Sequence, residues 1–115
     1  MSGPGNMAID ARGNVWSTNN YEYSRDPHAP VCGSNLLLEF TPTGQYVAGS
    51  PFAGGGLNGA GFGITLDPAG HVWVGNYGFA ADACGHQPPH NSVSEFTPAG
   101  SGPVRCRTAR RHAGR

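Results

Sequence analysis

The stretch Gly5-Asn-Met-Ala-Ile-Asp-Ala-Arg-Gly-Asn-Val-Trp-Ser-Thr-Asn19 recurs later in the chain as Gly61-Phe-Gly-Ile-Thr-Leu-Asp-Pro-Ala-Gly-His-Val-Trp-Val-Gly-Asn76. The aspartates of the two copies, Asp10 and Asp67, lie 57 positions apart, and the tryptophans have the same spacing. A fixed spacing between matched segments is the signature of a repeat architecture. The sequence therefore predicts two similar structural units within its 115 residues.

A second pair of matched segments follows the first. Leu38-Glu-Phe-Thr-Pro-Thr-Gly44 matches Ser94-Glu-Phe-Thr-Pro-Ala-Gly100 at an offset of 56 positions. Four short stretches in the two units begin with Asp or Thr and end with Gly: 10–13, 41–44, 67–70 and 97–100. The first side chain can cap a turn, and the glycine tolerates a positive φ. Each stretch is predicted to join two antiparallel strands.

The segments that flank these turns are rich in β-branched and aromatic residues, and none has a capped helical period. We therefore expect an all-β fold of about two four-stranded antiparallel blades, the second of them incomplete. The first blade should have strands near 7–10, 14–18, 36–41 and 45–48. The second should have strands near 62–67, 71–76 and 92–97, with its fourth strand missing.

The expected boundaries follow from these strands. The first blade spans 1–52 with an insertion at 20–34, and the second spans 53–100 with a crossover at 53–61 and an insertion at 77–90. Residues 1–100 hold two Arg and seven acidic residues, whereas residues 101–115 hold five Arg and no acidic residue. We expect this basic tail to be disordered. It contains no aromatic residue, so nucleic-acid binding is not expected.

No apolar run reaches the roughly 18 residues that a membrane span needs, and no basic-then-apolar leader is present. We therefore expect no membrane association. The compartment remains open.

The pattern G-x-x-I-D-x-x-G-N-V-W, followed by N-x-V-x-E-F-T-P-x-G, resembles the blades of NHL-repeat proteins, above all the streptogramin lyase (virginiamycin B lyase)-like branch. The resemblance covers about residues 3–100 outside the insertions, and it implies a β-propeller. Lyases of that branch are metal-assisted enzymes with His and Glu in a central cavity. Those residues do not carry over, because His71 lies in a turn, and Glu39 and Glu95 occupy ordinary strand positions.

Closed propellers contain about four to eight blades, so this chain is expected to be an incomplete fragment of one. The missing blades could come from a longer reading frame, which the basic tail favours if it is a frame-shifted end. They could also come from other copies of the chain, three of which would close a six-blade ring.

The two insertions are expected on the same face of neighbouring blades, and each carries one cysteine and at least one histidine. Three interpretations remain open: a disulfide between Cys32 and Cys84, a zinc site, or two polar loops with unpaired thiols. The zinc ligands would be drawn from His28, Cys32, Cys84, His86 and His90. Cys106 leaves the cysteine count odd.

Candidate ligand-binding residues end the second strand of each blade: Asn19, Asn20, Asn76 and Tyr77. Trp16 and Trp73 could stack on sugars, although packing between blades is the favoured interpretation. We expect a non-catalytic propeller fragment whose loops bind a protein or a small ligand, without a cofactor unless zinc or another divalent metal is held. The alternatives are a metal-dependent lyase or lactonase that needs further blades, and a carbohydrate-binding ring of identical chains.

Overall fold

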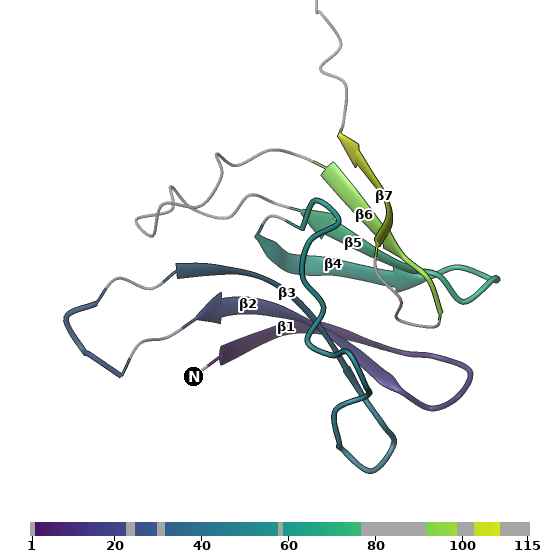
Figure 1. Cartoon of the computed structure of the whole chain (residues 1–115), viewed down its shortest axis with the longest axis horizontal. Helices are drawn as coiled ribbons and strands as arrows, with labels where there is room; N and C mark the ends of the chain where they lie inside the picture. The colour runs from purple at the N-terminus through teal and green to yellow at the C-terminus, as the bar shows by residue number, and fades with distance from the viewer. Residues whose placement is uncertain are drawn as a thin grey trace, which may run out of the picture.

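The computed structural model describes residues 2–22, 25–29, 32–57, 59–76, 92–98 and 103–108. Within these ranges the chain is all-β and has no helix, as the sequence predicts. The described residues therefore include no helical segment that could span a bilayer. The strands form two antiparallel sheets, which lie one above the other in Figure 1. The strands are β1 (Ser2–Ile9), β2 (Val15–Glu22), β3 (Cys32–Phe40), β4 (Ala60–Leu66), β5 (Val72–Asn76), β6 (Ser92–Phe96) and β7 (Pro103–Thr108).

Both sheets are meanders, in which each strand pairs with the next one along the chain. The first sheet has the order β1-β2-β3 and the second β4-β5-β6-β7. The pairing of the second sheet repeats that of the first, because Ala8 faces Trp16 and Thr65 faces Trp73 in register. Sequence positions offset by 57 in the first two strands, and by 56 in the third, are therefore structurally equivalent.

The predicted turns are confirmed where the structure describes them. The glycines that end them, Gly13, Gly44 and Gly70, have φ values of 81°, 83° and 82°. Each donates its backbone N–H to the carbonyl of the first turn residue at 2.9–3.0 Å. A glycine takes this left-handed conformation without the steric cost that a side chain would add.

The first sheet lacks the fourth strand that was expected at 45–48. The segment forms no regular ladder with β3. It has isolated bridges between Leu37 and Phe52 and between Phe40 and Tyr46, and Val47 donates its backbone N–H to the carbonyl of Glu39 at 3.0 Å. The chain turns over residues 47–50, where Ser50 donates its backbone N–H to the carbonyl of Val47 at 2.9 Å and Gly49 has a φ of 89°. This turn begins inside the expected strand and prevents a regular strand over 45–48.

The fourth strand of the second sheet is present, contrary to expectation. β7 pairs antiparallel with β6 inside the segment that was expected to be a disordered tail. It was missed because its sequence, Pro103-Val-Arg-Cys-Arg-Thr108, lacks the run of β-branched and aromatic residues that marks the other strands. Backbone pairing to an open sheet edge does not require that signal.

The insertion predicted at 20–34 is shorter than expected. β2 continues to Glu22, and β3 begins at Cys32. The ends of β2 and β5 and the starts of β3 and β6 lie at one end of the sheets, opposite the turns between β1 and β2 and between β4 and β5 (Figure 1). The β2–β3 and β5–β6 connections therefore leave from the same end, as predicted.

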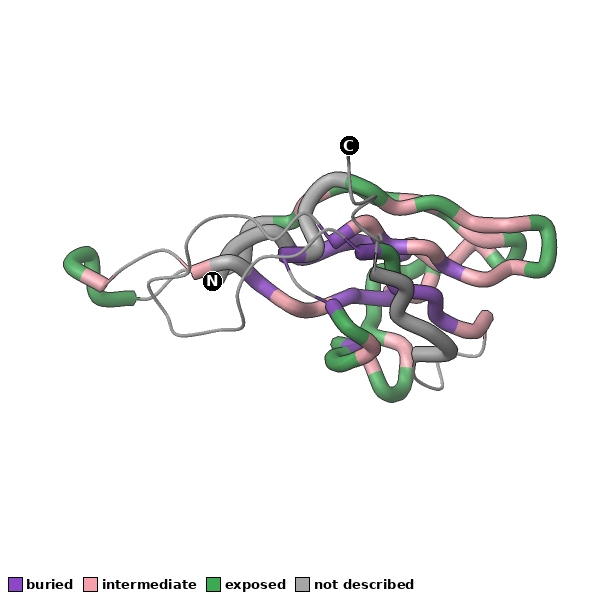
Figure 2. The backbone as a smooth tube through the Cα atoms, turned by 90° about the horizontal axis from the view of Figure 1, so that it is seen from above, coloured by how far each residue is buried: buried purple, intermediate pink, exposed green. Residues whose placement is uncertain are grey.

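The core lies between the two sheets, where buried segments of both layers face each other (Figure 2). Trp16 stacks on Phe52 with ring centroids 5.8 Å apart. The buried cluster consists of Trp16, Leu37, Phe52, Leu57, Val72, Val74 and Phe96, with Ile64 and Leu66 packed against it. Neither sheet has a separate core among the described residues, so each depends on the other.

A substitution at Leu37 tests whether each sheet depends on the other, because the Leu37 side chain is fully buried between them. We expect Leu37→Ala to lower the free energy of unfolding by about 2–5 kcal/mol, the usual cost of truncating a buried leucine. Gln45→Ala, at an exposed position beside the same sheet, should change it by less than about 0.5 kcal/mol. Urea unfolding followed by tryptophan fluorescence measures both, and equal effects would contradict a core between the sheets.

Candidate functional site

The turn between β4 and β5 is organised by Asp67. Its Oδ1 accepts the backbone N–H groups of Ala69 and His71, each at 2.9 Å. Its Oδ2 accepts the indole N–H of Trp73 at 3.0 Å. One carboxylate thus fixes both the turn and the orientation of the tryptophan on the next strand.

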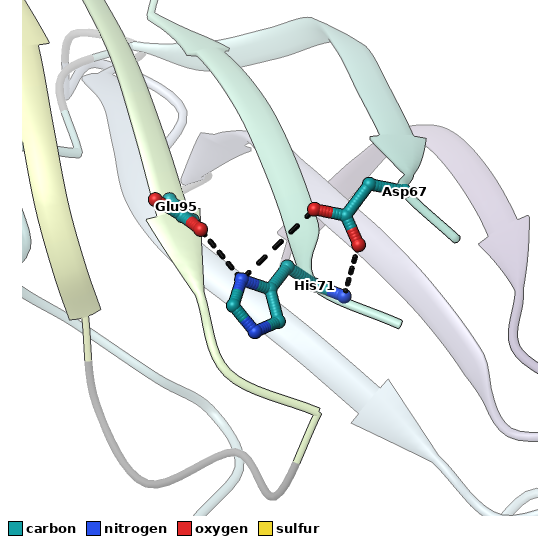
Figure 3. Close-up of side chains that lie close together, drawn as sticks. All are labelled: Asp67, His71 and Glu95. Carbon is teal, nitrogen blue, oxygen red and sulfur yellow. Dashed lines mark hydrogen bonds and ion pairs between the residues drawn. The ribbon is translucent and has the colours of Figure 1, made fainter. Parts of the chain in front are cut away.

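His71 lies between this aspartate and the neighbouring strand (Figure 3). Its Nδ1 is 2.5 Å from Glu95 Oε1 and 4.0 Å from Asp67 Oδ2. The side chains of His71 and Asp67 are 30% and 29% exposed, whereas that of Glu95 is only 9% exposed. The three residues form a partly open polar cluster at the turn end of the second sheet.

The first sheet has an equivalent cluster with different chemistry. Asp10 caps its turn by accepting N–H groups from Arg12 and Asn14, and it accepts the indole N–H of Trp16 at 3.0 Å. Asn14 takes the place of the histidine and donates from Nδ2 to Glu39 Oε1 at 2.9 Å. The frame of aspartate, tryptophan and glutamate is therefore conserved between the two units of the chain.

The residue at the position of Arg12 in the second unit is Ala69. Arg12 thus marks a difference between the two turns. Its guanidinium lies 3.1 Å from Asp10 Oδ2 and 3.2 Å from Glu39 Oε1, so it bridges the two carboxylates. It also donates to the carbonyl of Pro98 at 2.6 Å, which ties the first sheet to the end of β6 in the second.

Both turn aspartates have a pKa below the ordinary value of 3.8. Burial opposes ionisation of Asp10, but hydrogen bonds from Trp16, Asn14 and Arg12 outweigh burial and lower the pKa. For Asp67 the hydrogen bond from Trp73 is the main cause of the lowered pKa, with contributions from His71 and Ala69. The folded chain therefore favours the ionised carboxylates.

The second cluster brings together three groups that can hold a proton or a metal ion. One ligand atom from each of Asp67, His71 and Glu95 lies within 4.8 Å of the other two. Imidazole and carboxylate are ligands for zinc and for other divalent ions. Among the described residues this is the one such grouping of three or more ligand side chains.

The candidate ligand-binding asparagines lie inside the sheets. Asn19 is 1% exposed and donates to Ser34 Oγ at 2.8 Å. Asn76 is 3% exposed and donates to the hydroxyl oxygens of Ser92 and Ser94 at 3.0 and 2.8 Å. These bonds cross between neighbouring strands. For the other two candidates, the side chain of Asn20 and all of Tyr77 lie outside the described part of the chain.

The residues proposed for a disulfide or a zinc site are only partly described. Cys32 begins β3 and is disulfide-bonded, so its sulfur is not available as a thiolate ligand. His28 lies in an exposed turn, where its backbone N–H donates to Asp26 Oδ1. The remaining candidates, Cys84, His86 and His90, lie outside the described residues, and the pairing of Cys32 with Cys84 stays a prediction.

Sequence reasoning treated His71 as a turn residue and Glu95 as an ordinary strand residue, and it did not bring them together. The signal was present in the repeat. A polar residue four positions after each turn aspartate, Asn14 or His71, recurs with a glutamate at the same place in the third strand, Glu39 or Glu95. Recurrence of both members indicates cross-strand contact.

The lowered pKa of Asp10 predicts an acid-dependent loss of stability. Stability from its ionised form is complete above pH 3.8 and is lost as the pH falls through the lower pKa of the folded chain. We expect Asp10→Asn to flatten this acid dependence. The variant should also be less stable at pH 7 by about 1–3 kcal/mol, because an amide N–H then faces the buried indole N–H of Trp16.

Urea unfolding between pH 2.5 and 7 measures both effects. Asp67→Asn, at the equivalent position, is expected to flatten the acid dependence in the same direction. An Asp10→Asn variant that keeps the full acid dependence of the wild type would contradict this role of the carboxylate.

No protein-family model, no curated protein and no solved structure matches the chain.

Proposed function

We propose that the chain is a sheet-stacking module of an NHL-like or streptogramin lyase-like propeller, whose outer faces are covered by further sheets of the same kind. The observation that carries this proposal is a difference in exposure between equivalent residues. Ile64 and Leu66 of β4 pack against the core between the sheets. Their equivalents in β1, Met7 and Ile9, are 67% and 68% exposed.

The outer face of the second sheet exposes residues whose equivalents in the first sheet are buried. Trp16 and Leu37 are fully buried where the first sheet meets the second. Their equivalents, Trp73 and Val93, lie on the outer side of the second sheet, where Trp73 is half-buried and Val93 is 40% exposed. The Met7–Ile9 face and the Trp73–Val93 face thus repeat the two halves of the interface already formed inside the chain.

Two faces of this kind fit each other head to tail. The Met7–Ile9 face of one copy can pack on the Trp73–Val93 face of another, as β4 and β5 pack on the first sheet. Such heterologous contacts close into a ring when the rotation between copies allows it. Three chains would supply six sheets, within the range of closed propellers. Burial of the exposed apolar side chains supplies the driving force.

The module serves as a scaffold for binding. Its β2–β3 and β5–β6 connections leave from one end of the sheets (Figure 1), and a ring would gather them into one surface for a protein or a small ligand. Lyase or lactonase chemistry would need cavity histidines and acids from other blades. The carbohydrate-binding alternative has less support, because Trp16 is fully buried and cannot stack on a sugar.

Charged substitutions on the two faces test the head-to-tail contact. We expect the wild-type chain to form oligomers in sedimentation velocity experiments. Ile9→Glu and Val93→Glu should each give monomers, because each variant removes one of the two faces that must meet. A 1:1 mixture should give dimers and nothing larger, since the intact face of one variant fits the intact face of the other. Gln45→Glu, away from both faces, should assemble like the wild type.

Two outcomes would contradict the proposal. One is a wild-type chain that stays monomeric at about 100 µM and melts cooperatively. The other is an oligomeric wild type whose face variants each form dimers on their own, which indicates that each face pairs with itself.

A further inference from the structure

The first sheet is linked to the second by a cationic side chain at its turn. Arg12 donates from its guanidinium to the carbonyl of Pro98 at 2.6 Å. The same nitrogen lies 3.1 Å from Asp10 Oδ2 and 3.2 Å from Glu39 Oε1. A donor held between two carboxylates at this turn thus reaches across to the sheet that packs on the first.

In the second sheet a histidine nitrogen lies in the corresponding place between two carboxylates. His71 Nδ1 is hydrogen-bonded to Glu95 Oε1 at 2.5 Å and lies 4.0 Å from Asp67 Oδ2. The register sets Arg105 of β7 opposite Glu95, so a cationic residue stands beside this glutamate on the neighbouring strand. The other ring nitrogen of His71, Nε2, points away from both carboxylates (Figure 3) and has no hydrogen-bond partner among the described residues.

The repeat indicates which acceptor His71 meets in the head-to-tail contact. Pro42 in the turn after β3 corresponds to Pro98 in the turn after β6. The ring of Pro42 lies 3.2 Å from the position of a Cβ on Gly13. The ring of Pro98 lies in the same way, 3.3 Å from the position of a Cβ on Gly70. When the second sheet packs on the first sheet of the next copy, the Pro42 carbonyl of that copy takes the place that the Pro98 carbonyl has within the chain.

We propose that His71 links neighbouring copies by donating a hydrogen bond from Nε2 to the Pro42 carbonyl of the next copy, and that the link forms when the imidazole is protonated. This inference rests on the head-to-tail contact of the proposed function. A neutral imidazole carries one proton, and the carboxylate of Glu95 places that proton on Nδ1, which leaves Nε2 as an acceptor. A second proton makes Nε2 a donor, and histidine is the side chain whose charge changes between pH 5 and 8.

The other charged groups near the imidazole do not change the sign of this effect. Asp67 has a pKa below the ordinary value of 3.8, so its carboxylate stays ionised above pH 5. Glu95 accepts the Nδ1 proton in both states of the imidazole, and the guanidinium of Arg105 stays charged throughout this range. The turn at 41–44 of the next copy, Thr-Pro-Thr-Gly, has no ionisable side chain. Acid therefore strengthens the contact between copies.

Sedimentation velocity over a concentration series at pH 5.5 and pH 8 tests the link. We expect the association constant of the wild type to be about tenfold higher at pH 5.5, because hydrogen bonds from charged donors are stronger than those between neutral groups. His71→Asn should lose most of this pH dependence. Its amide can bond to Glu95, as Asn14 bonds to Glu39, but it gains no proton. His28→Asn, in an exposed turn outside both faces, is the matched control and should keep the pH dependence of the wild type.

A second variant copies the first turn into the second. His71→Asn combined with Ala69→Arg supplies a permanently charged donor, so assembly at pH 8 should be about as strong as that of the wild type at pH 5.5 and should vary little with pH. An oligomer with the same pH dependence in the wild type and in His71→Asn overturns the link but leaves the head-to-tail contact in place. A wild type that is monomeric at both pH values overturns both.

Discussion

Mutual burial of the two sheets is the constraint on which the rest of this structure depends. A three- or four-stranded meander with apolar residues on both faces cannot keep either face in water without cost. Here one face of each sheet is covered by the other, with Trp16 and Leu37 on one side and Val72, Val74 and Phe96 on the other. On the outer faces several equivalent positions are also apolar, namely Met7 and Ile9 for Ile64 and Leu66, and Trp73 and Val93 for Trp16 and Leu37.

The first polar turn cluster adds a hydrogen bond between the two sheets. Asp10 accepts the indole N–H of Trp16, and this bond holds the largest buried side chain of the interface in one orientation. Arg12 then reaches from that turn to the carbonyl of Pro98 on the other sheet. The apolar contact buries the facing sides of the two sheets, whereas the hydrogen bond from Arg12 links the first turn to the segment after β6.

The sequence was sufficient for the fold class, the repeat, the described turns and six of the seven strands, because each has a local signal. Aspartate or threonine followed by glycine marks a turn, and β-branched or aromatic runs mark the strands. β7 lacked such a signal, since pairing with the edge of β6 depends on the backbone of another strand. The site was harder to predict than the strands, because the contact between His71 and Glu95 joins residues 24 positions apart in the sequence.

Repetition explains how one frame can carry two different chemistries. Asp10 and Asp67 are tied to their turns and tryptophans by the same hydrogen bonds, so neither can change without loss of structure. The positions two and four residues further on are not tied in this way, because there the turn uses only backbone N–H groups. Those positions hold arginine and asparagine in one unit and alanine and histidine in the other. These two positions, where the units differ in charge and in hydrogen-bonding groups, thus lie beside the carboxylates that both units share.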